Sequence, residues 1–284
     1  MSGNLASSPP ASLLSVYQGY FGLNERPFNI TPDPKFLYLG NMHRATLDQL
    51  KLGLSERAGF ILLTGEVGCG KTTICRRLLA ELDPQRYDTA LILTPRLTEA
   101  QMLRSILIDL GEKKCARCTA ELIAQIHAVL LARTEAGKVI VLVIDEAQDL
   151  SLEVLEQIRL LSNLETDKQK LLQILLAGQP ELKRILARHD MRQLRQRILV
   201  TAEVKPLSRT DLAQYVHHRL TCAGGTSRIG FSGVALFVIH RLSRGIPRIV
   251  NQLCDKSMLS AFTRSSNEVR LCDVVCAYQE VSWL

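Results

Sequence analysis

A glycine-rich loop occupies residues 65–72, where the chain reads Gly-Glu-Val-Gly-Cys-Gly-Lys-Thr. This order fits the pattern G-x-x-x-x-G-K-[ST], which wraps the phosphate chain of a nucleotide. Glycine lets the backbone turn its amides toward the anion, and a following helix adds the positive end of its dipole. We expect Lys71 to reach the β- and γ-phosphates and Thr72 to bind Mg²⁺. The residues predicted to hold ATP or ADP are Gly65, Glu66, Val67, Gly68, Cys69, Gly70, Lys71, Thr72 and Thr73.

Two carboxylates, Asp145 and Glu146, follow the apolar run Val139–Ile144. Asp145 is predicted to hold Mg²⁺ with Thr72, partly through water, and Glu146 to polarise the attacking water as a general base. With the loop, the pair favours ATP binding and hydrolysis over the chemistry of a small GTPase. The order Asp-Glu-Ala-Gln at residues 145–148 also resembles helicase motif II, but such helicases need two lobes and only one fits here.

Three further sites are predicted to complete the chemistry. Gln179 follows an apolar strand and is a candidate sensor of the γ-phosphate or the attacking water, although a plain turn would also explain it. Arg195 and Arg197 precede the last predicted strand, and either could act as a finger on a neighbouring subunit's nucleotide, with Arg197 favoured. A solvated basic face is the alternative. Arg248 opens a later helix after Gly-Ile-Pro and is expected to point toward the γ-phosphate, unless it belongs to an ordinary helix start.

Strands and helices alternate around these residues. Continuous apolar strands of this kind indicate a parallel sheet with helices on both faces. The predicted strands are Phe60–Leu63, Thr89–Thr94, Lys138–Ile144, Leu171–Ala177 and Ile198–Val204. The helices predicted among them are His43–Leu54, Lys71–Leu82, Ala100–Gly111, Ala120–Glu135, Leu152–Leu164 and Glu181–Arg188. The pattern does not reveal the order of the strands.

The domain organisation follows from where the strands stop. Residues 1–19 are expected to form a flexible tail, 20–205 an α/β nucleotide-binding domain, and 206–284 a small all-helical domain. The segment Tyr20–Gly40, dense in aromatic residues and proline, is expected to strap across the first domain. The helices predicted in the second domain are Leu212–Cys222, Val234–Leu242, Ile249–Phe262 and Cys272–Val281.

The amino-acid composition indicates which kinds of partner the protein could bind and in which cellular environment it works. The formal net charge of +7 and the pI of about 9.1 are compatible with acidic partners. Because no long basic block appears, arginines that line a nucleotide site and subunit contacts are the preferred explanation of the charge. No apolar run approaches the ~20 residues of a membrane-spanning helix. Cys115 and Cys118 could form half of a zinc site or a redox pair, but they lack a second pair, and the cysteines as a set fit a reducing cytoplasm.

Together these residues resemble the AAA+ ATPases, and within them the ExeA/GspA type of general secretion pathway ATPase with its MshM-like pilus-assembly relatives. The stretches that carry the resemblance are Tyr20–Phe28, Thr31–Pro34, Thr64–Thr73, Asp145–Gln148, Leu176–Leu182, Leu194–Ile198 and Gly245–Arg248. The resemblance implies a five-stranded P-loop sheet with a helical lid. It also implies assembly into rings or filaments, in which ATP turnover remodels a partner. Longer relatives continue into a membrane span and a cell-wall-binding domain, and this sequence ends at Leu284.

Three functions therefore compete. The first is a cytoplasmic ATPase, peripheral at the inner membrane, that acts with a secretion or pilus-assembly partner and with copies of itself. The second is a DNA-associated AAA+ regulator of the transposition or helicase-loader kind. The third is a nucleotide-gated binding module with negligible turnover, against which Glu146 argues.

Overall fold

The computed structural model describes residues 13–29, 34–93, 96–165, 170–224 and 228–281. The chain forms two compact units. The first contains residues 41–205, and the second combines the N-terminal segment up to Gly40 with residues 206–284. None of the described helices combines the length and the apolar character needed to cross a membrane.

The α/β unit contains a five-stranded sheet whose order is β2-β3-β4-β1-β5. Every neighbouring pair in it is parallel. The strands are β1 (Phe60–Gly65), β2 (Tyr87–Ile92), β3 (Val139–Ile144), β4 (Leu172–Gly178) and β5 (Ile198–Val204). The predicted α/β fold is thus confirmed. The strand predicted at Thr89–Thr94 corresponds to β2, which begins two residues earlier, and Thr94 lies outside the described residues. Strand β4 lies between the strand of the glycine-rich loop and the strand that ends before Asp145.

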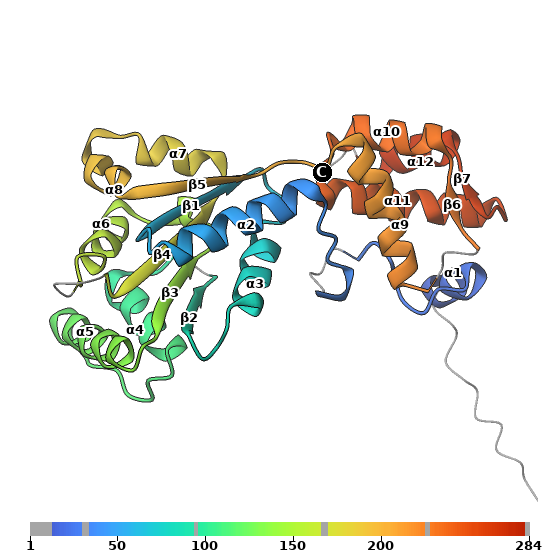
Figure 1. Cartoon of the computed structure of the whole chain (residues 1–284). Helices are drawn as coiled ribbons and strands as arrows, with labels where there is room; N and C mark the ends of the chain where they lie inside the picture. The colour runs from blue at the N-terminus through green and yellow to red at the C-terminus, as the bar shows by residue number, and fades with distance from the viewer. Residues whose placement is uncertain (1–12, 30–33, 94–95, 166–169, 225–227, 282–284) are drawn as a thin grey trace, which may run out of the picture. The chain divides into compact units, whose positions relative to one another are not determined.

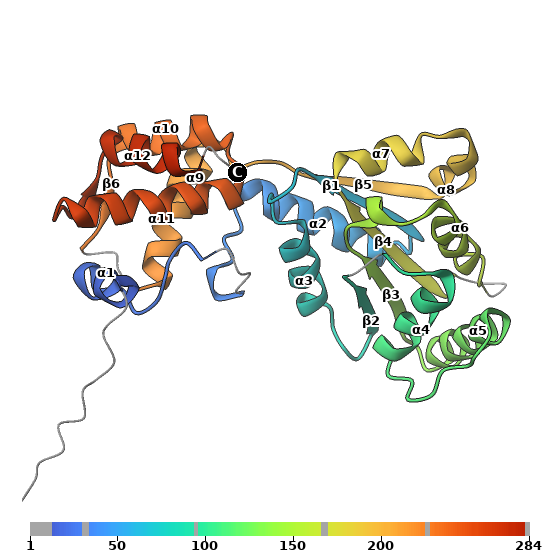
Figure 2. The same ribbon diagram turned by 180° about the vertical axis from the view of Figure 1, so that it is seen from behind.

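Helices cover both faces of this sheet (Figures 1 and 2). One face packs against α4 (Glu99–Asp109), α5 (Thr119–Glu135), α6 (Leu152–Leu161) and α7 (Pro180–Leu186) in one apolar core. The other face carries α2 (Asn41–Ser55) and α3 (Lys71–Glu81), which contact β5, β4 and β1. Burial on both sides explains why β3 is a continuous run of aliphatic residues, each buried.

Local sequence fixes the helix starts near the site. The Thr98 hydroxyl accepts from the backbone amide of Gln101, and the Gln101 side-chain oxygen accepts from the backbone amide of Thr98. This reciprocal pair is a capping box that begins α4. The Ser151 side chain accepts from the backbone amide of Val154 and so caps α6, and Pro180 occupies the first turn of α7. The short helix α8 (Arg192–Gln196) follows a 3₁₀ turn and leads into β5.

The second unit is mainly helical, as expected. Its helices are α1 (Leu13–Phe21), α9 (Arg209–Cys222), α10 (Gly233–Ser243), α11 (Pro247–Thr263) and α12 (Leu271–Val281). It also contains a parallel pair of two-residue strands, β6 (Gly230–Phe231) and β7 (Glu268–Val269), which the sequence did not predict.

The N-terminal segment differs from expectation in two ways. Residues 13–19, assigned to a flexible tail, belong largely to α1, and Tyr17 there is buried. Tyr20–Gly40 belongs to the helical unit rather than to the α/β unit. Its aromatic rings find their apolar partners there, since Phe28 lies edge-on to Phe231 with the ring centroids 6.0 Å apart. The tail residues 1–12 lie outside the described part of the chain.

Candidate nucleotide site

The glycine-rich loop connects β1 to α3, and two of its glycines adopt backbone conformations that other residues avoid. Gly68 and Gly70 lie in the left-handed region, with φ of 81° and 94°. Gly65 is needed for a different reason, because a Cβ there would lie 2.6 Å from the carbonyl oxygen of Val204 in β5. The loop between the strand and the helix N-terminus is therefore shaped to bring backbone amides to an anion.

Lys71, the first residue of α3, is 4% exposed although it carries a charge. Its ammonium donates to the loop carbonyls of Gly65 and Glu66, at 3.0 and 3.2 Å. The two carbonyls hold the cation over the loop, where a phosphate chain cradled by the amides would meet it. Glu66 and Val67 themselves are exposed at the turn.

Thr72 and Asp145 meet across the space between α3 and β3. The Thr72 hydroxyl donates to Oδ2 of Asp145, and the backbone amide of Glu146 donates to Oδ1 at 2.9 Å. Asp145 is 2% exposed. A hydroxyl and a carboxylate oxygen are ligands suited to Mg²⁺, which uses few protein oxygens and completes its shell with water and phosphate. Among the described residues there is no group of three or more His, Cys, Asp or Glu side chains placed to hold a metal ion.

Glu146 is held by two glutamines. Its backbone is left-handed, with φ of 50°, just before a 3₁₀ turn at Ala147–Asp149. The side-chain amides of Gln148 and Gln179 both donate to its Oε2, at 2.8 and 3.2 Å. Gln148 also accepts a bond from the backbone amide of Gln179, at 3.0 Å. The structure thus brings the predicted base and sensor together, and it adds Gln148, for which no role was predicted.

Two buried cysteines border the site. Burial raises the pKa of the Cys69 thiol, with Lys71 opposing it in part. Burial also raises the pKa of Cys75, which the neighbouring Asp145 reinforces. Both side chains therefore remain protonated thiols and act as small buried apolar groups.

Arg195 and Arg197 lie at the opposite edge of the sheet from the loop. They precede the first residue of β5, whereas the loop follows the last residue of β1, and the two strands are parallel. At about 3.3 Å per residue the edges are roughly 20 Å apart, too far for either arginine to reach the loop of its own chain. Arg197 donates to Ser162 Oγ at 2.7 Å, and Arg195 to the carbonyl oxygen of Ala187 at 3.1 Å.

Arg248 belongs to the helical unit, where it is exposed in the first turn of α11. The Gly245 that precedes it has φ of 75°, and a Cβ there would lie 2.2 Å from the carbonyl oxygen of Leu207. The turn before α11 is therefore fixed by a glycine. The reach of Arg248 toward the nucleotide stays a prediction.

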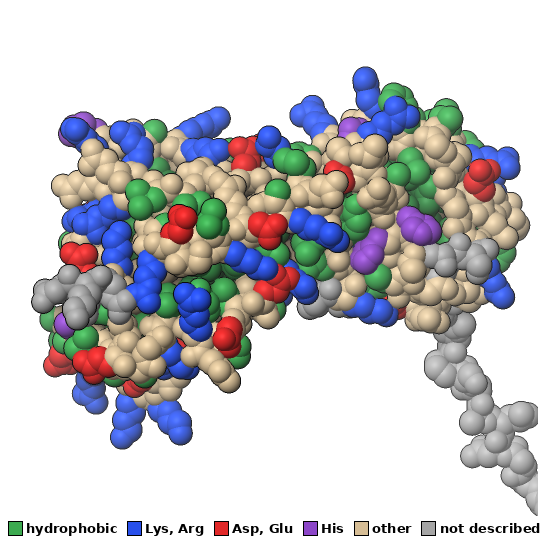
Figure 3. Space-filling model, in the orientation of Figure 1, with side chains coloured by type: hydrophobic (Ala, Val, Ile, Leu, Met, Phe, Trp, Pro, Cys, Tyr) green, Lys and Arg blue, Asp and Glu red, His purple; other side chains and the backbone are tan. Residues whose placement is uncertain are grey.

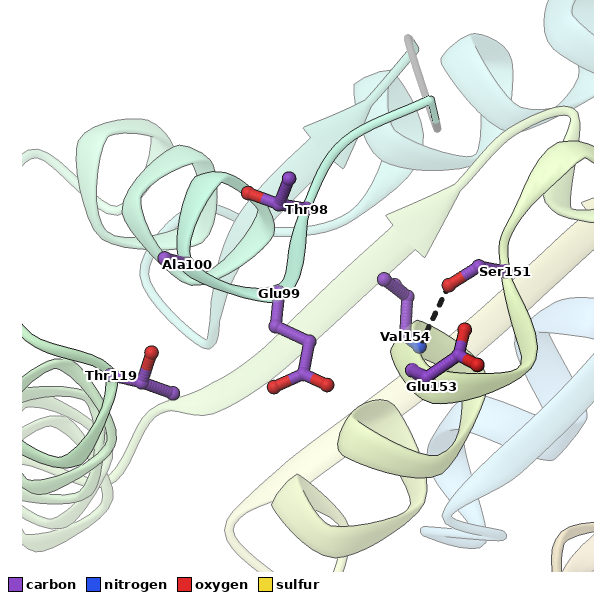
Figure 4. A pocket seen from close by; sticks show the side chains of 7 residues that line it. All are labelled: Thr98, Glu99, Ala100, Thr119, Ser151, Glu153 and Val154. Atoms are coloured by element: carbon purple, nitrogen blue, oxygen red, sulfur yellow. Dashed lines mark hydrogen bonds between the residues drawn. The ribbon is translucent and has the colours of Figure 1, made fainter.

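A cavity of about 400 Å³ lies apart from the loop, where α4, α5 and α6 begin. Figure 4 shows Glu99 pointing into the gap between the starts of α5 and α6, with Glu153 on the other side. The side chains that line it are Thr98, Glu99, Ala100, Thr119, Ser151, Glu153 and Val154. None of these is a predicted nucleotide ligand, so the cavity is not the nucleotide site.

Comparison with known proteins identifies the class. Residues 54–186 match a family model described as an AAA domain. The fold is shared with Drosophila ORC bound to DNA (TM-score 0.71, 19% identity, 99% of this chain and 70% of that one). It is also shared with Aeropyrum pernix ORC2 (0.67, 15%, 90% and 72%) and with the Thermotoga maritima RuvB branch migration motor (0.57, 19%, 85% and 70%). The chain belongs to the AAA+ P-loop ATPases.

A curated relative narrows the class. General secretion pathway protein A of Aeromonas hydrophila is 46% identical over 268 residues, which cover 94% of this chain and 49% of that protein. The chain is thus an AAA+ ATPase of the ExeA/GspA type, and it spans about half the length of that relative. The solved structures, all below 25% identity, support the fold and not a shared activity.

Proposed function

We propose that this protein hydrolyses ATP to ADP and phosphate with Glu146 as general base. The observation that carries the proposal is the position of the Glu146 carboxylate, held by two amides directly after the Asp145 that pairs with Thr72. Both amides bond to Oε2, so Oε1 is the oxygen that can take a proton from water. When bound, Mg²⁺ supplies positive charge to the phosphates.

Each remaining residue has a distinct proposed role. Lys71 neutralises developing charge on the phosphates, and Thr72 and Asp145 hold Mg²⁺. Gln179 orients the carboxylate and contacts the γ-phosphate or the water. Arg197, or else Arg195, acts on the nucleotide of a neighbouring copy, and Arg248 closes on the nucleotide from the lid.

The test of the chemistry is phosphate release by the full chain with ATP and Mg²⁺. Glu146→Gln keeps the shape of the side chain and removes the base, so turnover is expected to fall by roughly 10²–10⁴-fold. Binding of a fluorescent ATP analogue should stay near that of the parent. Glu153→Gln is the matched control, because Glu153 is an exposed acid at the start of α6. Equal turnover by Glu146→Gln and the parent would overturn the proposal.

The relationship to general secretion pathway protein A supports a proposal for the biological role. We propose that copies of this chain assemble at the cytoplasmic face of the inner membrane and use ATP turnover to assemble or remodel a secretion or pilus system. The formal net charge of +7 is compatible with an acidic protein partner. Figure 3 shows Lys and Arg side chains over much of the face in view, with Asp and Glu side chains scattered among them.

Deletion and complementation in the native host test this role. The parent gene should restore secretion or pilus assembly, and the Glu146→Gln variant should not. Light scattering should show a larger assembly with ATP than without nucleotide. Intact secretion and pili after deletion, together with tight duplex-DNA binding at ~50 mM salt that falls steeply with added salt, would favour the DNA-linked alternative instead.

A further inference from the structure

Gln148 occupies a position between the base and the sensor strand. Its amide nitrogen donates to Oε2 of Glu146 at 2.8 Å, and its amide oxygen accepts from the backbone amide of Gln179 at 3.0 Å. Both ends of one neutral side chain are therefore engaged. One end is on the proposed base and the other on the backbone of the residue that follows β4.

The backbone around Gln148 is arranged to permit this bridge. Glu146 adopts φ of 50°, and its carbonyl accepts from the amide of Asp149 at 2.9 Å, which closes the 3₁₀ turn. Ala147 in that turn is fully buried and fixes it against the core. On the other side, a Cβ at Gly178 would lie 2.9 Å from the amide oxygen of Gln148. A glycine at the end of β4 therefore leaves the space that the amide occupies.

The chemistry of the two contacts restricts the side chain at this position. The side chain must donate to the Glu146 carboxylate and at the same time accept from the Gln179 backbone amide, and it must do both as a neutral group. Lysine cannot accept, and glutamate cannot donate when ionised. Leucine has a similar volume and can do neither, which would leave the Gln179 amide without this partner.

We propose that Gln148 is a positioning residue for hydrolysis: it fixes Oε2 of Glu146 so that Oε1 faces the attacking water, and it ties the carboxylate to the end of β4. This inference rests on the proposed role of Glu146 as base. It implies that Gln148 governs the turnover of bound ATP and not the binding of ATP. A misplacement of about 1 Å at a reacting group is enough to cost on the order of 100-fold in rate.

The test compares Gln148→Leu and Gln148→Glu with the parent in steady-state phosphate release and analogue binding. We expect Gln148→Leu to lower kcat by about 10–100-fold while KM and the analogue Kd change by less than about threefold. Gln148→Glu keeps the acceptor, loses the donor and adds a like charge, so its kcat should be lower still. Gln85→Leu, at an exposed position between α3 and β2, is the control for a new leucine and should match the parent.

A double-mutant cycle separates positioning from structure. With Glu146→Gln already present, Gln148→Leu should change the residual rate by less than about twofold, because no base remains to be positioned. Full additivity, an unchanged kcat in Gln148→Leu, or parallel losses in kcat and analogue binding would each overturn the inference. If the parent shows Glu146-dependent hydrolysis and Gln148→Leu equals the parent, only this inference fails. If Glu146→Gln equals the parent, the proposed function fails and takes this inference with it.

Discussion

At the carboxyl edge of the sheet, where β1, β3 and β4 end, the acids Asp145 and Glu146 take their hydrogen bonds from neutral groups. These are a threonine hydroxyl, a backbone amide and two glutamine amides. At the amino edge the second residue of β2, Asp88, is bound by two cations. Lys138 lies 2.7 Å from its Oδ1, and Arg133 bonds its Oδ2.

This difference in hydrogen-bond partners separates acids proposed to take part in the chemistry from an acid that stabilises the fold. A carboxylate paired with lysine and arginine has its charge balanced within the chain, and its contribution is to the fold. A carboxylate whose partners are neutral keeps its full negative charge for a cation or a proton. Arg195 and Arg197 lie at the amino edge. Under the proposed function, the amino edge of one copy would therefore supply positive charge to the nucleotide bound at the carboxyl edge of a neighbouring copy.

The largest expected effect tests whether the amino edge acts on another copy. Arg197→Ala should lower ATP turnover by about 10³-fold, since an arginine finger stabilises charge in the transition state, while analogue binding by the same chain is retained. Mixing Arg197→Ala protein with Lys71→Ala protein should restore part of the activity. In a mixed assembly, an intact loop of one copy can face an intact Arg197 of the other.

Arg195→Ala is the control for this prediction. If Arg197 is the finger, losing the bond from Arg195 to the Ala187 carbonyl should change turnover by no more than a few-fold. A larger loss in Arg195→Ala than in Arg197→Ala would assign the finger to Arg195. No loss in either variant would mean that these arginines form a solvated basic face, the alternative that the sequence left open.

The carboxyl edge shows how far sequence alone could go. The loop and the Asp145–Glu146 pair are contiguous motifs, and the strand before each is a run of buried aliphatic residues, so both the elements and their polar ends could be predicted. Gln148 could not be assigned a role in the same way. Its second contact is with Gln179, 31 positions away, and that contact depends on β4 pairing with β3, a long-range choice that local patterns do not encode.

The prediction for the N-terminal segment was wrong for a related reason. Tyr20–Gly40 has no helical or strand period to show which surface its rings will bury against. Its partners come from residues far along the chain, as when Arg219 in α9 donates to the Pro27 carbonyl at 2.5 Å and lies 5.0 Å from the Phe36 ring centroid. The strands β6 and β7 were not predicted because a strand of two residues is too short to show alternation of apolar and polar side chains.

The second prediction removes charge at the carboxyl edge. Asp145→Asn can keep its bond with Thr72, because a hydroxyl can accept from the new amide as readily as it donates to the carboxylate. The free energy of unfolding should therefore change by no more than about 1 kcal/mol, the typical effect of a single substitution that keeps its hydrogen bonds. Turnover should fall on the order of 100-fold or more, because the proposed Mg²⁺ ligand is lost. Urea unfolding and phosphate release across a Mg²⁺ titration measure the two effects. A variant that is as active as the parent would remove Asp145 from the site.

The smallest expected effect is the same substitution at the amino edge. Asp88→Asn should leave ATP turnover unchanged and lower the free energy of unfolding by up to about 1 kcal/mol at pH 7, since the pair is only partly shielded from water. Burial acts to raise the pKa of Asp88, but the bonds from Lys138 and Arg133 outweigh it and hold the pKa below its usual range. The stabilisation is therefore fully present above the ordinary value of about 3.9 and is lost as the pH falls through the lower, folded-state pKa.

Urea unfolding at several pH values checks this sign. The gap between the parent and Asp88→Asn should be constant from about pH 8 to pH 5 and should close below about pH 4. A gap that widens in acid would mean that Asp88 is not held ionised by its cations. Loss of turnover without loss of stability would mean that Asp88 behaves like Asp145. Either result would remove the distinction between the two edges, because that distinction requires the two asparagine substitutions to have opposite effects on fold and on chemistry.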